Sequence, residues 1–131
     1  MTKASLLALA LAPLALTACT DGHPAEHRAA PPAARITGPA VSCVPILAAR
    51  ESQVRDDWTI DFLSGPGRTG WRNTLPNRCI GLKSREAFTY ETSLTQLCSS
   101  DIIYVLENYG GTPQRGAGCG LGQFVPIELE R

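Results

Sequence analysis

The sequence predicts a mainly β domain, a small antiparallel sheet of about five strands that is curled toward a barrel and held by two disulfides. Three observations predict this fold class. Apolar residues recur with a period of two, Gly and Pro clusters separate these segments, and four cysteines lie in the same part of the chain, at Cys43, Cys79, Cys98 and Cys119.

The first eighteen residues have the pattern of a signal peptide. Lys3 is followed by an almost unbroken Ala and Leu run that ends near Leu16, which is short of the roughly 20 residues that span a bilayer. Leu16 to Cys19 read LTAC and resemble a lipobox. We therefore expect cleavage before Cys19, lipid on its thiol and a periplasm-facing position in the cell envelope. By resemblance to known lipoprotein sorting, Thr20 after Cys19 favours the outer over the inner membrane. An ordinary secretory signal that happens to contain a cysteine is the alternative to the lipobox.

Residues 19–40 are predicted to form a disordered tether. The stretch is rich in Ala and Pro and has only Ile36 as a large aliphatic side chain, so it cannot bury enough apolar surface to order itself. The folded domain is expected at residues 41–131. Without Lys3 the chain has eleven basic and twelve acidic residues, a balance that gives no electrostatic case for nucleic acid.

The strands are expected in the following order. Residues 58–63 and 70–75 alternate apolar and polar side chains around a Gly- and Pro-rich break, which predicts a hairpin. Residues 87–91 form a third strand, and residues 102–106, apolar on both faces, form a central one. Residues 123–129 are predicted at an edge, because Pro126 cannot donate to a ladder. Residues 93–98 are expected to form one helical turn.

The four domain cysteines are interpreted as two disulfides, because an even number in a small exported domain is typical of them. Three connectivities are possible. We favour Cys79 with Cys98 and Cys43 with Cys119, which ties the first segment to the last. Neither the paired knuckles of zinc ribbons nor a C-x-x-C redox motif is present.

No catalytic residue, metal or cofactor is expected. The chain has two histidines, His23 and His27, and both lie in the predicted tether, where a metal site with Glu26 has no scaffold to hold it. Asp56 and Asp57 are adjacent carboxylates at the entrance to a strand, and a turn explains them better than an acid and base pair.

Two further features are candidates for binding. Trp71, Arg72 and Tyr90 could form a stacking surface for a sugar or peptide, although aromatic residues on strands are more often core. The glycines between Gly110 and Gly122 do not end in Gly-Lys-Ser/Thr, so a wide turn with a bulge is expected there and no phosphate loop.

The domain resembles a family of short bacterial exported proteins and lipoproteins that is known only as a domain of unknown function. The resemblance rests on a spaced pattern that begins at Cys43 and contains VRDDWTIDF (54–62), WRNTLP (71–76), CIGL (79–82), AFTY (87–90), SLTQLC (93–98), DII (101–103) and CGLGQFVP (119–126). Ile80 departs from it, since the family often has proline there. The resemblance implies the architecture and no activity.

Three functions follow as hypotheses. The first is a non-enzymatic lipoprotein that binds an envelope protein or glycan. The alternative is a periplasmic inhibitor of a hydrolase such as lysozyme, with residues 64–70 or 109–118 inserted into the enzyme cleft. The third and weakest is a small hydrolase that uses Asp56 or Asp101.

Overall fold

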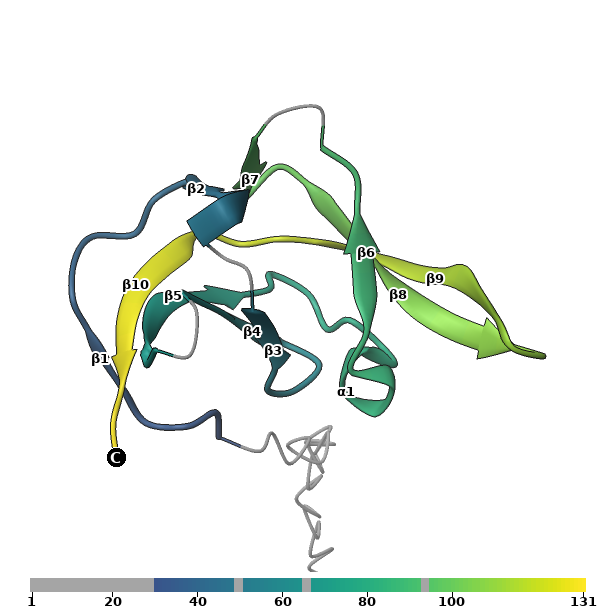
Figure 1. Ribbon diagram of the computed structural model, residues 1–131, viewed down its shortest axis with the longest axis horizontal. Coiled ribbons are helices and arrows are strands. Elements are labelled where there is room, and N and C mark those ends of the chain that lie inside the picture. The colour runs from purple at the N-terminus through teal and green to yellow at the C-terminus, as the bar shows by residue number, and fades with distance from the viewer. Residues whose placement is uncertain (1–29, 49–50, 65–66, 93–94) are drawn as a thin grey trace, which may run out of the picture.

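The computed structural model describes residues 30–48, 51–64, 67–92 and 95–131, and these fold into a mainly β structure (Figure 1). Its largest sheet has five antiparallel strands in the order β1-β10-β5-β4-β3. These strands are β1 (Ala34–Ile36), β3 (Glu51–Val54), β4 (Thr59–Leu63), β5 (Thr69–Thr74) and β10 (Phe124–Leu129).

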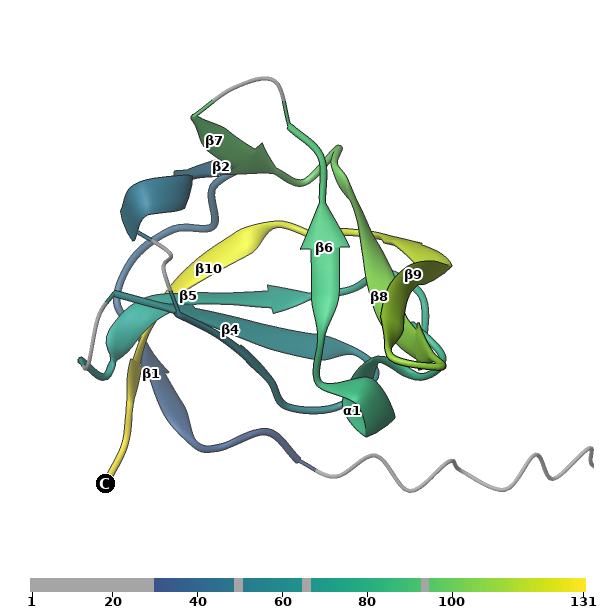
Figure 2. The same cartoon turned by 45° about the vertical axis from the view of Figure 1, so that its right-hand side comes forward.

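Two smaller sheets complete the fold. One has the order β6-β8-β9, from β6 (Phe88–Tyr90), β8 (Ile102–Tyr109) and β9 (Thr112–Gly120). The other pairs β2 (Cys43–Pro45) with β7 (Gln96–Cys98). A 3-10 turn covers Ile46–Ala48, and the short helix α1 covers Leu82–Arg85. In Figure 2, β6 runs across the direction of β4 and β5, so the two larger sheets pack at a steep angle.

The core lies between these sheets. Phe62 of β4 is at its centre, with its ring 5.6 Å from that of Phe124 and 6.3 Å from that of Phe88 between centroids. Because side chains alternate along a strand, Ile60 and Phe62 face this core and Asp61 faces away from it. The buried Asn73 is hydrogen-bonded through both side-chain atoms, since its Nδ2 donates to the carbonyl of Gly122 and its Oδ1 accepts from the backbone N–H of the same residue.

The mainly β class, the antiparallel sheet and the two disulfides are confirmed. All five predicted strands are present, as β4, β5, β6, β8 and β10. The expected curl toward a barrel is not found. The five-stranded sheet is open, with β1 and β3 at its edges, and β6 to β9 pair in the two smaller sheets before β10 returns to the first. Between β5 and β6 the chain forms α1, and β6 then runs across the direction of β4 and β5 (Figure 2).

The edge position predicted for residues 123–129 is wrong, because β10 lies between β5 and β1. Pro126 is tolerated there by its register. In an antiparallel strand the N and C=O of one residue point to the same neighbour, and the Pro126 carbonyl accepts from Thr37 on the β1 side. The missing N–H of Pro126 therefore faces the position just after the end of β1, and the backbone hydrogen bonds between β10 and β5 are unaffected.

Two local predictions also fail. Part of the helical turn expected at residues 93–98 is instead β7 (Gln96–Cys98), which is fixed opposite β2 by backbone pairing, and residues 93–94 lie outside the described residues. The predicted tether, residues 19–40, contains β1, which pairs with β10 from Ala34 opposite Leu129 to Ile36 opposite Ile127. Backbone hydrogen bonds order β1, and Ile36 stays exposed, so composition gave no sign of the strand.

The disulfides join Cys43 to Cys98 and Cys79 to Cys119, so the favoured connectivity was wrong. Cys43 and Cys98 lie directly opposite each other in the β2–β7 pair. Cys79 precedes α1, which contacts β8, and Cys119 lies opposite Ile103 of β8. The Cys79–Cys119 bridge therefore joins two segments that both lie beside β8. Their proximity depends on the strand topology and cannot be inferred from the spacing of the cysteines.

Candidate functional site

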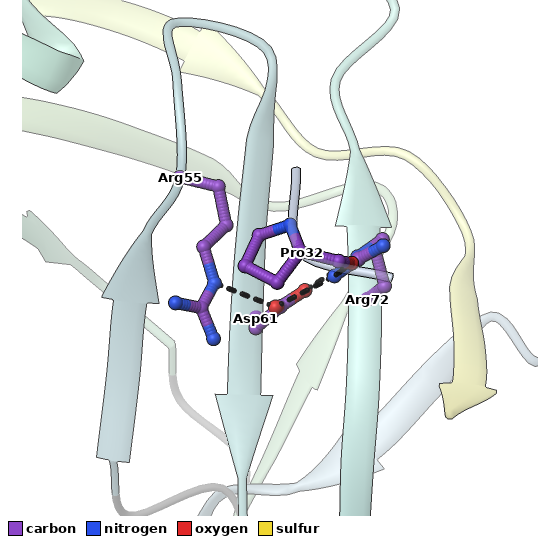
Figure 3. A network of polar contacts seen from close by, with 4 residues as sticks. All are labelled: Pro32, Arg55, Asp61 and Arg72. Carbon is purple, nitrogen blue, oxygen red and sulfur yellow. Dashed lines mark hydrogen bonds and ion pairs between the residues drawn. The ribbon is translucent and has the colours of Figure 1, made fainter. Parts of the chain in front are cut away.

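A buried carboxylate with two arginines lies on the outer face of the five-stranded sheet. Asp61 is fully buried in β4. Its Oδ2 accepts a hydrogen bond of 2.7 Å from Arg55 Nε, and its Oδ1 accepts one of 2.7 Å from Arg72 Nε (Figure 3). Arg72 Nη2 adds a bond of 2.9 Å to Oδ2. Both Asp61 oxygens are thus used by guanidinium groups.

Strand register brings these residues together. Asp61 and Arg72 are cross-strand partners in the β4–β5 pair, so their side chains leave the same face. Arg55 directly follows β3 and continues the backbone pairing with β4, since its N–H donates to the Thr59 carbonyl. Arg72 Nη2 also donates to the Pro32 carbonyl at 2.9 Å. The segment before β1 therefore crosses the outer face at Asp61, as Figure 3 shows.

Charge at this cluster does not balance. One carboxylate faces two guanidinium groups, and the side chains of Arg55 and Arg72 are only 17% and 16% exposed. Arg72 uses Nε and Nη2 on Asp61 and Pro32. Among the described residues, Arg55 bonds through Nε alone. The cluster can hold the chain in place and attract an anion, and the Asp61 carboxylate is fully buried with both oxygens bonded to guanidinium groups.

The structure separates the residues predicted to form a stacking surface. Trp71 and Tyr90 are partly buried and pack against the core. Arg72, next to Trp71 in β5, faces the opposite side and binds Asp61. The two aromatic side chains and Arg72 therefore do not share a face.

The aspartates considered for hydrolysis serve local turns. Asp56 Oδ1 accepts from the Trp58 N–H at 2.7 Å, and Asp101 Oδ2 accepts from the Cys98 N–H at 2.7 Å. Asp57 points to a different set of partners, Arg78 and the N–H of Lys83. The turn predicted for Asp56 and Asp57 is present, and their carboxylates bind different groups.

A second feature is the β8–β9 hairpin, residues 102–120, which extends away from the rest of the molecule in Figure 1. Its turn is Gly110–Gly111, with φ of 64° and 90°, values that residues other than glycine rarely adopt. A bulge on β9 lies where the pairing shifts between Tyr104 and Leu106. The glycine-rich stretch is thus a tight turn and a bulged strand.

Polar and aromatic contacts organise the exposed part of this hairpin. Tyr109 beside the turn is 60% exposed, and its hydroxyl donates to Glu107. That hydrogen bond and the charge of Glu107 raise the pKa of Tyr109 above its ordinary value. Arg115 pairs with Glu91 and lies 5.1 Å from the centre of the Tyr104 ring, a cation–π contact. The pair lowers the pKa of Glu91.

A pocket at the end of β10 is lined by Arg35, Arg68, Glu128, Leu129, Glu130 and Arg131. Arg35 pairs with Glu128 and Arg68 binds the Leu129 carbonyl, so two of its guanidinium groups are engaged.

In the part of the chain that the structure describes, no group of His, Cys, Asp or Glu could hold a metal, and no helix has the length and hydropathy to cross a bilayer. His23, Glu26, His27 and Cys19 lie outside the described residues.

Sequence reasoning missed Asp61 and Arg55 as members of a site. The hairpin prediction contained one signal, since pairing residues 58–63 with 70–75 sets Asp61 opposite Arg72. Nothing in the sequence placed Arg55 or Pro32 beside them.

Comparisons with protein families, with curated proteins and with solved structures found no match to this chain. The resemblance to the family of short exported proteins stays a prediction.

Proposed function

We propose that this chain is a lipid-anchored, non-enzymatic binding module of the bacterial cell envelope, facing the periplasm, and that the β8–β9 hairpin contacts its partner protein. The observation that carries the proposal is the exposed hairpin with Tyr109 beside its tip. Tyrosine supplies a large contact area at low entropic cost, and it is enriched in protein interfaces. A tight turn with a paired strand on either side presents this ring on a rigid support.

The lipid anchor in the proposal rests on the LTAC sequence that ends at Cys19. Two or three acyl chains would hold the protein on a bilayer without a membrane-spanning segment. Thr20 favours the outer membrane.

Mass spectrometry of the protein purified from its native membrane tests the anchor. We expect a chain that begins at acylated Cys19 and gains four hydrogens on reduction, because each of the two disulfides takes up two. A chain that retains residues 1–18, or one that carries no lipid, contradicts the anchor. A measured mass that corresponds to a chain without residues 1–18 and without lipid would indicate ordinary secretion.

Photo-crosslinking in living cells tests the hairpin. A photo-reactive amino acid at Tyr109 should give a discrete adduct with one envelope protein. The matched control is the same amino acid at Ile80, which is 72% exposed and lies outside the hairpin. Adducts of equal yield from both positions, or none from Tyr109, contradict a specific contact at the tip.

A second candidate is inhibition of a hydrolase such as lysozyme. The same observation favours it, because a narrow hairpin can enter a cleft, and the predicted inhibitory segment 109–118 is the turn and most of β9. The adduct separates the two candidates. Capture of a hydrolase, with loss of its activity at one equivalent of this protein, supports inhibition. Capture of a structural envelope protein supports the first proposal. A hydrolase built on Asp56 or Asp101 stays the weakest candidate, because each accepts a backbone N–H within its own turn.

A further inference from the structure

The outer face of the five-stranded sheet has a cationic group with unused hydrogen-bond donors, Arg55. Its Nε donates to Asp61. Among the residues that the structure describes, no atom accepts a hydrogen bond from either Nη. In Figure 3 no dashed line reaches either terminal nitrogen, and one of the two points away from Asp61. Four N–H donors therefore form an open fork on a side chain that is 17% exposed.

The local charge makes this fork attractive to an anion. Asp61 can neutralise one guanidinium, and Arg72 binds it through two nitrogens, whereas Arg55 binds it through one. The cluster thus has one surplus positive charge. The charged residue of β3 on this face, Glu51, is four positions from Arg55, roughly 13 Å along a strand. Holding this surplus charge in a partly buried position is costly, and an anion would offset that cost.

We propose that the Arg55 fork is a binding site for an oxyanion, a carboxylate or a phosphate group. A guanidinium matches the two oxygens of either group with parallel hydrogen bonds. Gln53, exposed and opposite Asp61 in the β3–β4 pair, starts from the same face and can add an amide donor. The site lies in a different sheet from the hairpin and goes beyond the proposed binding function.

Nuclear magnetic resonance of the arginine side chains tests the site directly. Inorganic phosphate and acetate are titrated separately at constant ionic strength, with chloride as the replaced anion. We expect the Arg55 Nε–Hε signal to shift and to saturate at millimolar concentration with one or both probes. Saturation with phosphate alone identifies a phosphate site, and saturation with acetate alone identifies a carboxylate site. A shift that stays linear with both probes, or none, overturns the proposal.

Variants of Arg55 test whether the saturable shift arises from the two terminal nitrogens of its side chain. Arg55→Gln leaves the bidentate Arg72–Asp61 pair intact and should abolish the saturable shift of the backbone amides at Gln53 and Thr59. Arg55→Lys keeps the charge and loses the fork, so the apparent Kd should rise about fivefold or more, and this variant decides if Arg55→Gln fails to fold. Arg78→Gln, a change at an arginine paired with Asp57, is the matched control and should leave the Kd unchanged. Unchanged saturation in Arg55→Gln or Arg55→Lys overturns the site.

Discussion

At the residue scale, the most consequential side chain is Asp61. A fully buried carboxylate between two arginines is costly to desolvate, so its net contribution to stability can be small, although removing its charge leaves two cations without a counter-ion. The same residue also fixes the segment before β1, because Arg72 holds both Asp61 and the Pro32 carbonyl.

We predict that Asp61→Asn lowers the free energy of unfolding by about 3–5 kcal/mol, the cost of breaking a buried ion pair on one side. Urea denaturation of both proteins measures the difference. The matched control is Glu128→Gln, which breaks the exposed Arg35–Glu128 pair and should cost less than about 1 kcal/mol. Equal losses in the two variants would show that burial of Asp61 has no special effect.

A second residue-scale prediction concerns pH. The hydrogen bond to Glu107 and its charge raise the pKa of Tyr109 above its ordinary value of 10.0. A raised pKa means that the folded state holds the proton more tightly. The contribution to stability is therefore complete below the ordinary pKa and is lost as pH rises through the raised one. Tyrosine NMR titration should find Tyr109 titrating above 10.0, and Glu107→Gln should return it toward that value. A Tyr109 pKa that does not respond to Glu107→Gln contradicts the contact.

At the element scale, the two disulfides differ in surroundings and hardly in loop length. They close loops of 55 residues for Cys43–Cys98 and 40 for Cys79–Cys119, for which chain entropy gives nearly equal stabilisation, about 4 kcal/mol each. Cys79 is fully buried in the core, whereas Cys43 is only partly buried in the small β2–β7 sheet.

We therefore predict that replacing both Cys79 and Cys119 with Ala destabilises the protein more than replacing both Cys43 and Cys98. The difference should be about 1–2 kcal/mol, since only the first change leaves a cavity in the core. Urea denaturation gives the order of stability. Hydrogen exchange should show faster opening confined to β2 and β7 in the second variant. The reverse order would indicate that the β2–β7 sheet supports the core more than its small area suggests.

The sequence predicts an element well when the interactions that form it lie within one short segment, and poorly when they join segments that are far apart in the chain. The β4–β5 hairpin was predictable because both strands alternate in polarity across a short break. β9 was not, since TPQRGAGCG has little apolar pattern and its order comes from backbone pairing with β8. The disulfide connectivity and the place of Arg55 beside Asp61 depend on contacts between distant segments. Of the candidate site, only the Asp61–Arg72 pair was within reach of sequence reasoning.

At the scale of the whole molecule, the first strand changes where the domain begins. Composition placed the start of the folded part at Val41. The structure adds the β1–β10 pairing, the Arg72–Pro32 bond and a backbone bond from Glu130 to the Ala33 carbonyl, all from residues before that point. These contacts cover the edge of β10 and the outer face at Asp61.

The last prediction compares two soluble forms of the domain, one beginning at Ala30 and one at Val41. The shorter form loses β1, exposes the edge of β10 and removes the carbonyl partner of Arg72. With a net contribution of about 1 kcal/mol from each hydrogen bond, partly offset by the entropy of the released segment, we expect it to be less stable by about 1–3 kcal/mol. Urea denaturation at matched concentration measures this. An unpaired strand edge also favours association between copies, so the shorter form should show a higher tendency to oligomerise in sedimentation experiments. The form beginning at Ala30 is the control, and it should match the full mature chain in both measurements. Equal stability of the two forms would mean that the segment before Val41 lies against the sheet without stabilising it, and the boundary predicted from composition would then be the energetically correct one.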